Sequence, residues 1–363
     1  KAPVTVDWLP WNHTFGGNHN LNMILRSGGT MYIDGGKPAS GIIEKTVANL
    51  KEISPSIYFN VPRGYDMLIP YFENDPVLRE VFFKDLDIIF YAAAALTQSA
   101  WGKLEKLSKQ TTGKRVFMLS GWGATETSPD CTHVYWPISK AGVIGLPIPG
   151  TEIKLVPNEE KLEIRVRGPN IMPGYFKNPL LTKEAFDEDG FYRIGDAAKF
   201  EDPLDPSKGI VFDGRIAENF KLSTGTWVSV GSLRTTIVAC ADDVIQDVVI
   251  AGHDRDEIGV LVFPNILGCR SLCPELAVGA PVKQLIENKN VRAALIDGLR
   301  AHNATSFGSS TSISRARFMS EPPDIDANEI TDKGYINQQA VLSRRKNAVI
   351  LLYGLDDKNM LIE

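Results

Sequence analysis

The amino-acid sequence predicts a large α/β unit over residues 1–215, followed by a small α+β unit over residues 216–363. Up to about residue 215, short apolar runs alternate with stretches of helical periodicity, which is the pattern of a layered α/β structure. Two hairpin patterns interrupt this alternation, one late in the first unit and one early in the second. With 363 residues the chain is also longer than a single core usually supports.

Three runs in the first unit are expected to be strands, because each is short, apolar and bounded by proline, glycine or charge. They are residues 56–61, 86–91 and 116–119. Residues 98–109 carry apolar side chains three apart, which predicts a helix between the last two strands. Residues 152–155 and 162–166 alternate with period two across a polar turn, and they predict a hairpin with one solvated face.

The second unit begins with another hairpin pattern. Residues 246–250 and 259–263 are apolar runs that flank a charged connection, and residues 281–303 have the apolar spacing of one helix. We place the boundary between the units near residues 215–218, where a glycine and a short polar run follow a strand.

Composition excludes several classes of protein. The net charge of −5, without a basic stripe, argues against a dedicated nucleic-acid binder. No apolar run approaches the roughly 20 residues that cross a bilayer. Four cysteines in so long a chain make no disulfide framework, which predicts a cytoplasmic protein. The five histidines are scattered, and Cys269 and Cys273 without a second pair are a weak metal signal.

Residues 121–126, Gly-Trp-Gly-Ala-Thr-Glu, follow the third expected strand and suggest a ligand there. Glycine at a strand end lets the backbone approach a bound group, because any Cβ would block it. Trp122 could stack on a purine, Thr125 could contact a phosphate and Glu126 could offer a hard oxygen to Mg²⁺. The alternative is an ordinary strand exit, with Trp122 in the core and Glu126 in water.

Two further polar residues stand at positions where a nucleotide could be held. Asp196 follows a glycine turn, and its carboxylate could accept two hydrogen bonds from a ribose diol; an Asx-type turn cap is the alternative. Arg215, at the inferred hinge, offers planar donors for hydroxyl or phosphate oxygens, with a surface ion pair as its alternative. Together with residues 121–126, they predict a nucleotide site.

The order of five motifs resembles the successive core motifs of the adenylate-forming superfamily, which includes acyl-CoA synthetases. They are Leu9-Pro-Trp-Asn-His13, Gly121-Trp-Gly-Ala-Thr-Glu126, Arg167-Gly-Pro-Asn-Ile-Met-Pro-Gly-Tyr175, Tyr192-Arg-Ile-Gly-Asp196 and Asp213-Gly-Arg215. The residues around the first and last motifs are most similar to those of the feruloyl-CoA synthetase branch. The resemblance therefore implies the architecture of an adenylate-forming enzyme.

This resemblance implies a two-step reaction. A carboxylate attacks the α-phosphate of ATP, with Mg²⁺, to give an acyl adenylate, and coenzyme A then displaces AMP to give a thioester. Ferulate or a related hydroxycinnamate is the expected acid, and fatty or other aryl acids are alternatives. An adenylation domain that loads a carrier protein and a non-catalytic nucleotide-binding protein remain open. The expected partners are small molecules, without nucleic acid, and a homodimer is left open.

The resemblance also implies a role for each matching residue. Thr125 would contact phosphate, Glu126 would hold Mg²⁺, and His13 would stand near the acyl carboxylate and the thiol path. For His13 the alternative is a core histidine that holds a backbone carbonyl. Six residues are expected to bind the nucleotide: Trp122, Gly123, Ala93, Ala94, Asp196 and Arg215.

Two departures from the family pattern concern the loops that flank the reaction. The phosphate-cradling loop that should precede the His13 motif is absent from the sequence. We therefore expect that the N-terminal part of the large domain is missing and that the chain by itself could be inactive. The hinge position carries Ala217 in place of Asp or Lys, and the loop expected to face coenzyme A, from Lys221 to Gly225, is one residue longer than in the family.

A third departure concerns the late catalytic lysine. Lys333 is assigned to this role, although strict register would put Tyr335 in its place. A tyrosine hydroxyl cannot supply the positive charge that pairs with the carboxylate and the α-phosphate. The alternative is that Lys333 is an exposed loop residue.

Overall fold

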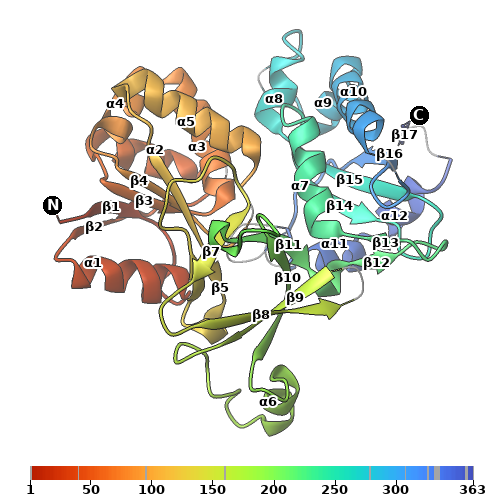
Figure 1. Ribbon diagram of the computed structural model, residues 1–363. Helices are drawn as coiled ribbons and strands as arrows, with labels where there is room; N and C mark the ends of the chain where they lie inside the picture. The colour runs from red at the N-terminus through yellow and green to blue at the C-terminus, as the bar shows by residue number, and fades with distance from the viewer. Residues whose placement is uncertain are drawn as a thin grey trace. The chain divides into compact units, whose positions relative to one another are not determined.

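A computed structural model describes residues 2–39, 41–94, 96–158, 161–277, 279–306, 308–324, 327–330, 336–355 and 359–362. The chain folds into two compact units, Lys1–Phe212 and Asp213–Glu363. The division follows Phe212, against an expected boundary after residue 215. The elements of both units are labelled in Figure 1.

A nine-stranded sheet organises the first unit, with the strand order β3-β4-β5-β6-β7-β11-β10-β9-β8. The strands are β3 (Ile57–Asn60), β4 (Ile88–Tyr91), β5 (Phe117–Gly123), β6 (Asp130–His133), β7 (Val143–Pro147), β8 (Glu152–Asn158), β9 (Lys161–Arg167), β10 (Tyr192–Phe200) and β11 (Ile210–Arg215). β3, β4 and β5 are parallel, as expected for an α/β layer. The three strands predicted from the sequence are confirmed.

β5 is longer than the sequence predicted. Its first residues pair in parallel with β4, and Gly121, Trp122 and Gly123 then pair antiparallel with β6. The expectation that the strand ends at residue 119 is therefore wrong. The two glycines lie inside the strand because β6 returns along it and supplies backbone partners.

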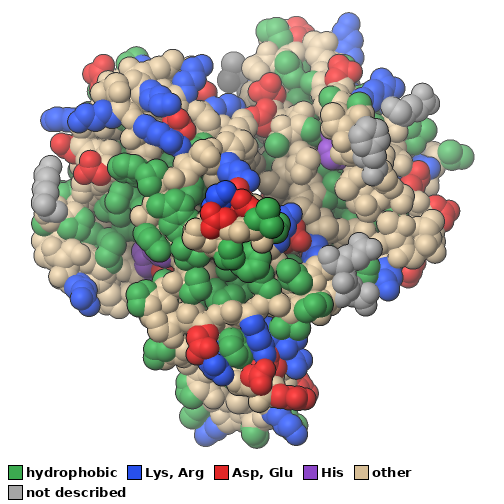
Figure 2. Space-filling model, in the orientation of Figure 1, with side chains coloured by type: hydrophobic (Ala, Val, Ile, Leu, Met, Phe, Trp, Pro, Cys, Tyr) green, Lys and Arg blue, Asp and Glu red, His purple; other side chains and the backbone are tan. Residues whose placement is uncertain are grey.

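The antiparallel half of the sheet contains the first predicted hairpin. β8 and β9 pair in register from Glu152 opposite Arg167 to Asn158 opposite Lys161. Acidic and basic side chains are interspersed over the face shown in Figure 2, which fits the absence of a basic stripe in the sequence. Between β5 and β11 the chain also forms three short helices: η2 (Thr125–Thr127), α6 (Pro179–Ala185) and η3 (Pro206–Lys208).

Four helices pack against the parallel strands and bury the main core (Figure 1). They are α2 (Ile43–Glu52), α3 (Pro62–Asn74), α4 (Pro76–Lys84) and α5 (Gln98–Thr112). Ordinary signals bound two of these helices: Asp75 starts α4 and Thr97 starts α5 as N-caps, and Gly113 ends α5 with φ +71°. The helix predicted over residues 98–109 is confirmed.

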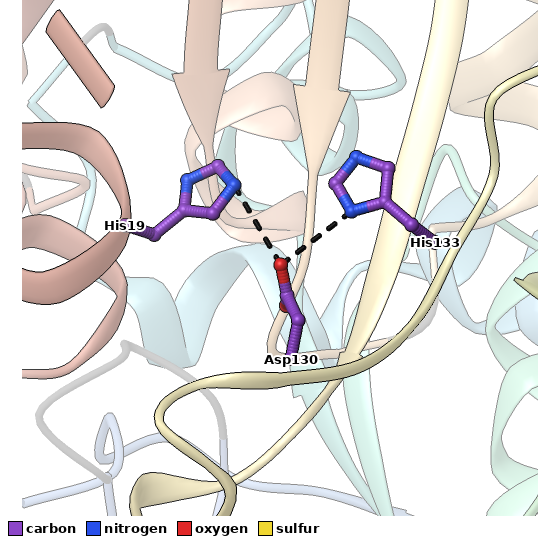
Figure 3. A group of neighbouring side chains, drawn as sticks. All are labelled: His19, Asp130 and His133. Carbon is purple, nitrogen blue, oxygen red and sulfur yellow. Dashed lines mark ion pairs between the residues drawn. The ribbon is translucent and has the colours of Figure 1, made fainter. Parts of the chain in front are cut away.

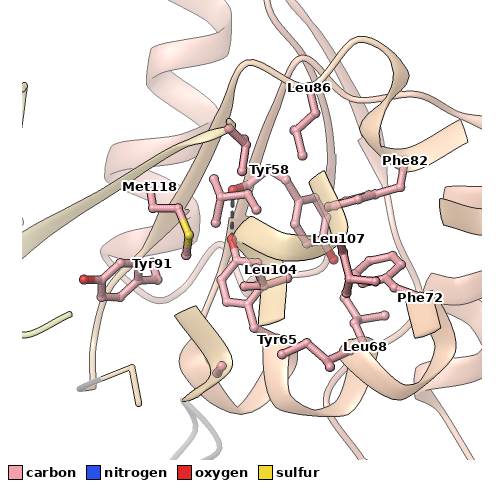
Figure 4. Close-up of a cluster of buried hydrophobic side chains, with 14 of the residues drawn as sticks. Tyr58, Tyr65, Leu68, Phe72, Phe82, Leu86, Tyr91, Leu104, Leu107 and Met118 are labelled. Carbon is pink, nitrogen blue, oxygen red and sulfur yellow. Dashed lines mark hydrogen bonds between the residues drawn. The ribbon is translucent and has the colours of Figure 1, made fainter. Parts of the chain in front are cut away.

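Aromatic residues fill this core (Figure 4). Phe72 and Phe82 stack with ring centroids 4.5 Å apart, and Tyr58 meets Phe82 edge to face. The buried Tyr65 hydroxyl donates to the carbonyl oxygens of Tyr58 and Phe90 at 3.0 and 2.8 Å. These two hydrogen bonds tie α3 to the ends of β3 and β4, which is the edge where the motif residues gather.

The chain start forms a small parallel pair, β1 (Val4–Asp7) and β2 (Thr30–Ile33). Between them lie a π-helix, η1 (Phe15–Leu21), and α1 (Asn22–Arg26). The buried carboxylate of Asp7 accepts from the Leu9 backbone N–H at 2.9 Å and from Asn20 Nδ2 at 2.7 Å. Burial raises the pKa of Asp7 to about 6.

The second unit is a four-stranded sheet covered on both faces. The strands β14 (Ile245–Ala251), β15 (Ile258–Pro264), β16 (Ile313–Phe318) and β17 (Met360–Leu361) lie in this order. The predicted second hairpin is confirmed as the β14–β15 pair. Alternate residues of β14 enter two different cores, Val248 in one and Val249 in the other, which explains the unbroken apolar run.

Helices α7 (Val230–Cys240), α8 (Ile266–Ser271), α9 (Val282–Glu287) and α10 (Lys289–Thr305) share the larger of these two cores. The single helix expected over 281–303 is wrong in one respect. It is broken at Asn288, whose side chain accepts from the Asn290 N–H at 2.8 Å and so starts a new helix. Helices α11 (Gln338–Arg344) and α12 (Lys346–Leu352) cover the other face.

The four cysteines form no disulfide. Cys269 and Cys273 are buried among apolar side chains of the second unit, so their shared spacing reflects the core. Across the described ranges, no helix has the length and apolarity that crossing a membrane requires.

Candidate active site

A tight turn follows β5 and carries Thr125 and Glu126. Its anchor is the buried hydroxyl of Thr127, which accepts from the Ala124 N–H at 2.8 Å and lies 2.7 Å from the Pro129 carbonyl oxygen. A Cβ on Gly123 would lie 1.9 Å from that same carbonyl oxygen. This glycine is therefore required by the returning chain itself, which differs from the expectation that the glycine makes room for a ligand.

Glu126 is held by a segment far along the sequence. Its Oε1 accepts from the Tyr175 hydroxyl at 3.1 Å, and its carbonyl oxygen accepts from the Met172 N–H at 2.8 Å. The Tyr175 hydroxyl also lies 3.3 Å from that of Tyr192. Burial, together with the Glu126 charge, raises the pKa of Tyr175, so this hydroxyl stays protonated and can donate. Glu126 is half-buried and oriented, while its neighbour Thr125 is exposed.

Trp122 and Asp196 meet although they are far apart in sequence. The indole Nε1 donates to Asp196 Oδ2 at 2.8 Å, and both side chains are buried. The Trp122 ring packs with Ile144 and Ile164, as the alternative interpretation held, and only 8% of the residue is exposed. Through its indole N–H, the tryptophan orients the Asp196 carboxylate.

The backbone before Asp196 is a bulge and not the turn predicted from the sequence. Asp196 lies within β10, whose register against β9 shifts between Arg193 and Ala197. Gly195 adopts φ +81°, a conformation that glycine accepts at little cost. From Arg193 to Ala197 the strand advances four residues against two on β9, and these extra residues re-aim the strand, which is how bulges commonly place a side chain at a site.

The next predicted residues are His13, just before η1, and two alanines just after β4. His13 is half-buried, and its Nδ1 accepts from the Phe15 N–H at 3.1 Å, so its ring fixes the start of η1. Ala93 and Ala94 are half-buried in the turn after β4, and Ala93 has a left-handed φ of +76° that is uncommon outside glycine. Ala93 packs against the cluster that contains Phe15 and Phe90.

The remaining predicted residues belong to the second unit. Arg215 and Ala217 are exposed, and Ala217 lies in a short 3-10 turn, η4 (Ile216–Glu218). Lys221 is exposed on β12 (Phe220–Lys221), with its Nζ 4.9 Å from the ring centre of Trp227. Gly225, with φ +83°, forms the turn that leads to β13 (Trp227–Val228). Lys333 and Tyr335 lie outside the described residues.

Sequence reasoning missed one cluster. His19 from η1 and His133 from β6 both face the carboxylate of Asp130 (Figure 3). His19 Nε2 lies 3.7 Å and His133 Nδ1 3.5 Å from Asp130 Oδ2. The histidines were read as scattered because residues 19 and 133 are brought together by the tertiary fold alone. The only local signal was the Asp130-x-x-His133 spacing.

The first unit thus unites three motifs: residues 121–126 and 192–196 meet through Trp122 and Asp196, and Tyr175 joins Glu126. Such a convergence of distant motifs at one edge of a sheet is typical of a binding site in an α/β protein. Comparison with known proteins finds a family match over slightly less than half of the chain. Residues 2–176 match the AMP-binding enzyme family.

Curated relatives are similar over parts of the chain. A long-chain-fatty-acid–[acyl-carrier-protein] ligase of Arabidopsis thaliana is 33% identical over 174 residues, which are 44% of this chain and 24% of that protein. A probable 4-coumarate–CoA ligase of Dictyostelium discoideum is 32% identical over 204 residues, 54% of this chain and 35% of the relative. The chain thus spans about a third or less of the length of these relatives.

The fold is that of adenylation domains. The adenylation domain of the carboxylic acid reductase from Segniliparus rugosus, solved with AMP and a co-purified carboxylic acid, superposes with a TM-score of 0.75 at 21% identity. The match covers 97% of this chain and 54% of that one. The predicted architecture, a large α/β sheet unit with a small C-terminal unit, is confirmed.

Proposed function

We propose that this chain belongs to an ATP-dependent acid–thiol ligase that makes an acyl adenylate and then passes the acyl group to a thiol. The family match over residues 2–176 supports the adenylation step. The single observation that carries the proposal is the 2.8 Å hydrogen bond from Trp122 to Asp196. This bond holds a buried carboxylate beside β5, the strand that leads into the Thr125–Glu126 turn. A fixed carboxylate of this kind suits the two hydroxyls of a ribose.

In this proposal, the residues of the turn act on the phosphates. Thr125 is exposed and presents its hydroxyl to the α-phosphate region, and Glu126 offers a hard oxygen that suits Mg²⁺. Mg²⁺, when bound, neutralises the charge that develops on the phosphates during carboxylate attack. The Tyr175 hydrogen bond keeps the Glu126 carboxylate oriented before the nucleotide arrives. Gly123, Ala93 and Ala94 are proposed to border the adenine.

The acid is proposed to be ferulate or a related hydroxycinnamate, and coenzyme A the acceptor. The residues of the motifs and the similarity to a probable 4-coumarate–CoA ligase support this choice. The similarity to a ligase named for an acyl-carrier protein keeps the other acceptor and longer acids as competing candidates. His13 is proposed to lie near the acyl carboxylate and the thiol path. The four free cysteines support a reducing compartment, and we propose the cytoplasm.

The residues of the second unit are proposed to serve the second half-reaction. Arg215 would grip the ribose, Ala217 would act as the hinge of a rotation, and Lys221 to Gly225 would face coenzyme A. Lys333 would stabilise the adenylation transition state by its charge. Replacing Lys333 with Ala is expected to slow adenylation roughly 10²-fold, while thioester formation from supplied acyl adenylate continues. If Tyr335→Phe has this effect and Lys333→Ala does not, the register is wrong.

The proposal is tested by acid-dependent pyrophosphate release with Mg-ATP, measured on the full-length protein across hydroxycinnamates, benzoates and fatty acids. We expect turnover with hydroxycinnamates, and free coenzyme A should accept the acyl group better than a phosphopantetheinylated carrier protein. Preference for the carrier would replace the proposed acceptor. Tight AMP binding without pyrophosphate release for any acid would instead support a non-catalytic nucleotide-binding protein.

A further inference from the structure

We propose that His19, Asp130 and His133 form a binding site for one divalent transition-metal cation, of which Zn²⁺ is the representative. Their donor atoms all lie within 4.8 Å of one another. Two imidazole nitrogens and one carboxylate oxygen are a ligand set that suits zinc and similar ions and leaves a further coordination position open. This site is separate from the Mg²⁺ site proposed at Glu126.

The two imidazole rings are held in place by packing. Each ring stacks against Phe90 with a centroid distance of 5.2 Å, and the two imidazole centroids lie 6.2 Å from each other. The His19 ring also meets Phe59 edge to face, with centroids 5.6 Å apart. Rings fixed in this way lose little further freedom when they bind an ion, which is the preorganisation that metal ligands need.

The hydrogen bonds behind His19 orient a lone pair toward the cluster. Asn20 donates from Nδ2 to the Asp7 carboxylate at 2.7 Å, so its Oδ1 faces His19 Nδ1, at 2.8 Å. The His19 Nδ1 position therefore carries the proton, and in a neutral ring Nε2 points an unshared pair at Asp130. This arrangement of histidine, amide and carboxylate is the outer shell that commonly supports a metal-bound imidazole.

A lone pair facing a carboxylate is unfavourable unless a proton or a metal cation lies between them. Asp130 Oδ2 is 3.7 Å from His19 Nε2 and 3.5 Å from His133 Nδ1. Two donors on a tetrahedral ion with bonds of about 2.0–2.1 Å are roughly 3.3–3.4 Å apart. The two distances to the carboxylate exceed what a bound ion requires by a few tenths of an ångström or less. All donor separations lie within 4.8 Å, so binding also draws the two imidazoles inward.

The backbone leaves room for the cluster at Gly121. A Cβ on this residue would lie 3.2 Å from Asp130 Oδ1 and 3.3 Å from His133 Nδ1. Gly121 pairs with His133 across β5 and β6, and its lack of a side chain leaves space for the donor atoms. The three side chains are 16%, 20% and 29% exposed, so an ion can reach them from solvent. This gives a second reason for glycine in the motif, unrelated to a nucleotide.

The test uses the whole chain, freed of metal with a chelator and titrated with Zn²⁺ against a chromogenic competitor. We expect one equivalent to bind, and His19→Ala and His133→Ala should each weaken binding roughly 100-fold or more, beyond the 10–100-fold range known for outer-shell changes. His253→Ala is the matched control, because this exposed histidine of the second unit lies outside the cluster, and it should bind as the unaltered chain does. Glu126→Gln should also leave Zn²⁺ affinity unchanged.

A measurement on the unaltered protein guards against variants that fail to fold. Imidazole ¹⁵N NMR should show the Nδ1–H form of His19, and Zn²⁺ should shift the ring signals of His19 and His133 and leave that of His253 in place. Gly121→Ala, which crowds the donors, should weaken binding as well. Absence of a one-to-one complex, or binding that persists when both cluster histidines are removed, would show that the cluster is a set of proton-mediated ion pairs and overturn the proposal.

Discussion

The indole N–H of Trp122, on β5, donates to the carboxylate of Asp196, on β10, across 2.8 Å of buried space. The two strands are separated by β6, β7 and β11 in the sheet order, so the sheet must curl to bring these side chains within 2.8 Å, and the bond links two motifs of the chain. A hydrogen bond to a buried charge contributes more than a neutral one, because the carboxylate has lost its hydration. The contact therefore both orients Asp196 and stabilises the site.

Trp122→Phe tests this relationship, because it keeps an aromatic ring in the core and removes the donor. We expect the free energy of unfolding to fall by about 2–3 kcal/mol, the scale for a buried charge that loses a hydrogen-bond partner. Urea denaturation gives the value. Trp101→Phe is the matched control, since its indole donates at 3.3 Å to Glu105, which also pairs with Lys109, and it should cost less. Equal losses in the two variants would mean that ring volume dominates.

Gly123→Ala tests the intramolecular reason for the motif glycine. The added Cβ would meet the Pro129 carbonyl oxygen at 1.9 Å, so the turn must distort, and we expect a loss of several kcal/mol with a clear fall in Tm. Gly102→Ala is the opposite control. Gly102 lies in α5 with open space around its Cβ position, so alanine should raise stability by roughly 0.5–1 kcal/mol. A harmless Gly123→Ala would show that the turn tolerates a side chain.

Glu126→Gln separates charge from position. Glutamine keeps an oxygen that can accept from Tyr175, so the fold should be unchanged, but it removes the negative charge proposed for Mg²⁺. We expect adenylation to slow roughly 10²-fold, with a higher Mg²⁺ concentration needed for half-maximal rate. Tyr175→Phe leaves the charge and loses the orienting bond, so its effect should be smaller. A Mg²⁺ dependence identical to that of the unaltered protein would contradict the assignment of Glu126.

The raised pKa of Asp7 predicts a pH dependence of stability. The folded pKa of about 6 exceeds the ordinary aspartate value of 3.8, so between these pH values the folded state binds more protons than the unfolded state. Stability contributed by this group is therefore present at low pH and is lost as pH rises from about 4 to about 6. The loss is about 3 kcal/mol, from roughly two pKa units at about 1.4 kcal/mol each.

Asp7→Asn removes the titration, so the difference in unfolding free energy between the unaltered protein and this variant should change by that amount from pH 4 to pH 7. Chemical denaturation at several pH values measures it. A constant difference for Asp7→Asn would show that burial does not penalise the ionised form.

The strands and hairpins were predictable from the sequence because short apolar runs and period-two alternation report burial directly. The predictions failed where tertiary pairing overrides local signals. Gly121 and Gly123 were read as a strand exit, yet β6 extends the strand through them. Gly195 was expected to form a turn but lies in a β-bulge. Residues 281–303 were expected to form one helix, but Asn288 starts a second helix within that range.

The site was predictable in part. The motifs that hold Trp122, Glu126 and Asp196 were found in sequence, but the hydrogen bonds that connect them depend on strand order. The cluster of His19, Asp130 and His133 had no periodic signal, because η1 and β6 meet only through the fold. Trp122 was expected to stack on a base, and its burial could be seen only once the neighbouring strands were in place.

The most direct test of the central claim is calorimetric titration of AMP into the unaltered protein and into Asp196→Asn, with folding of both checked by circular dichroism. If Asp196 receives the ribose, the variant should fold and bind AMP at least 10-fold more weakly, since a hydrogen bond to a charged group contributes roughly 1.5–3 kcal/mol. Equal AMP affinity in two folded proteins would contradict the account, because the carboxylate that Trp122 holds would then take no part in nucleotide binding.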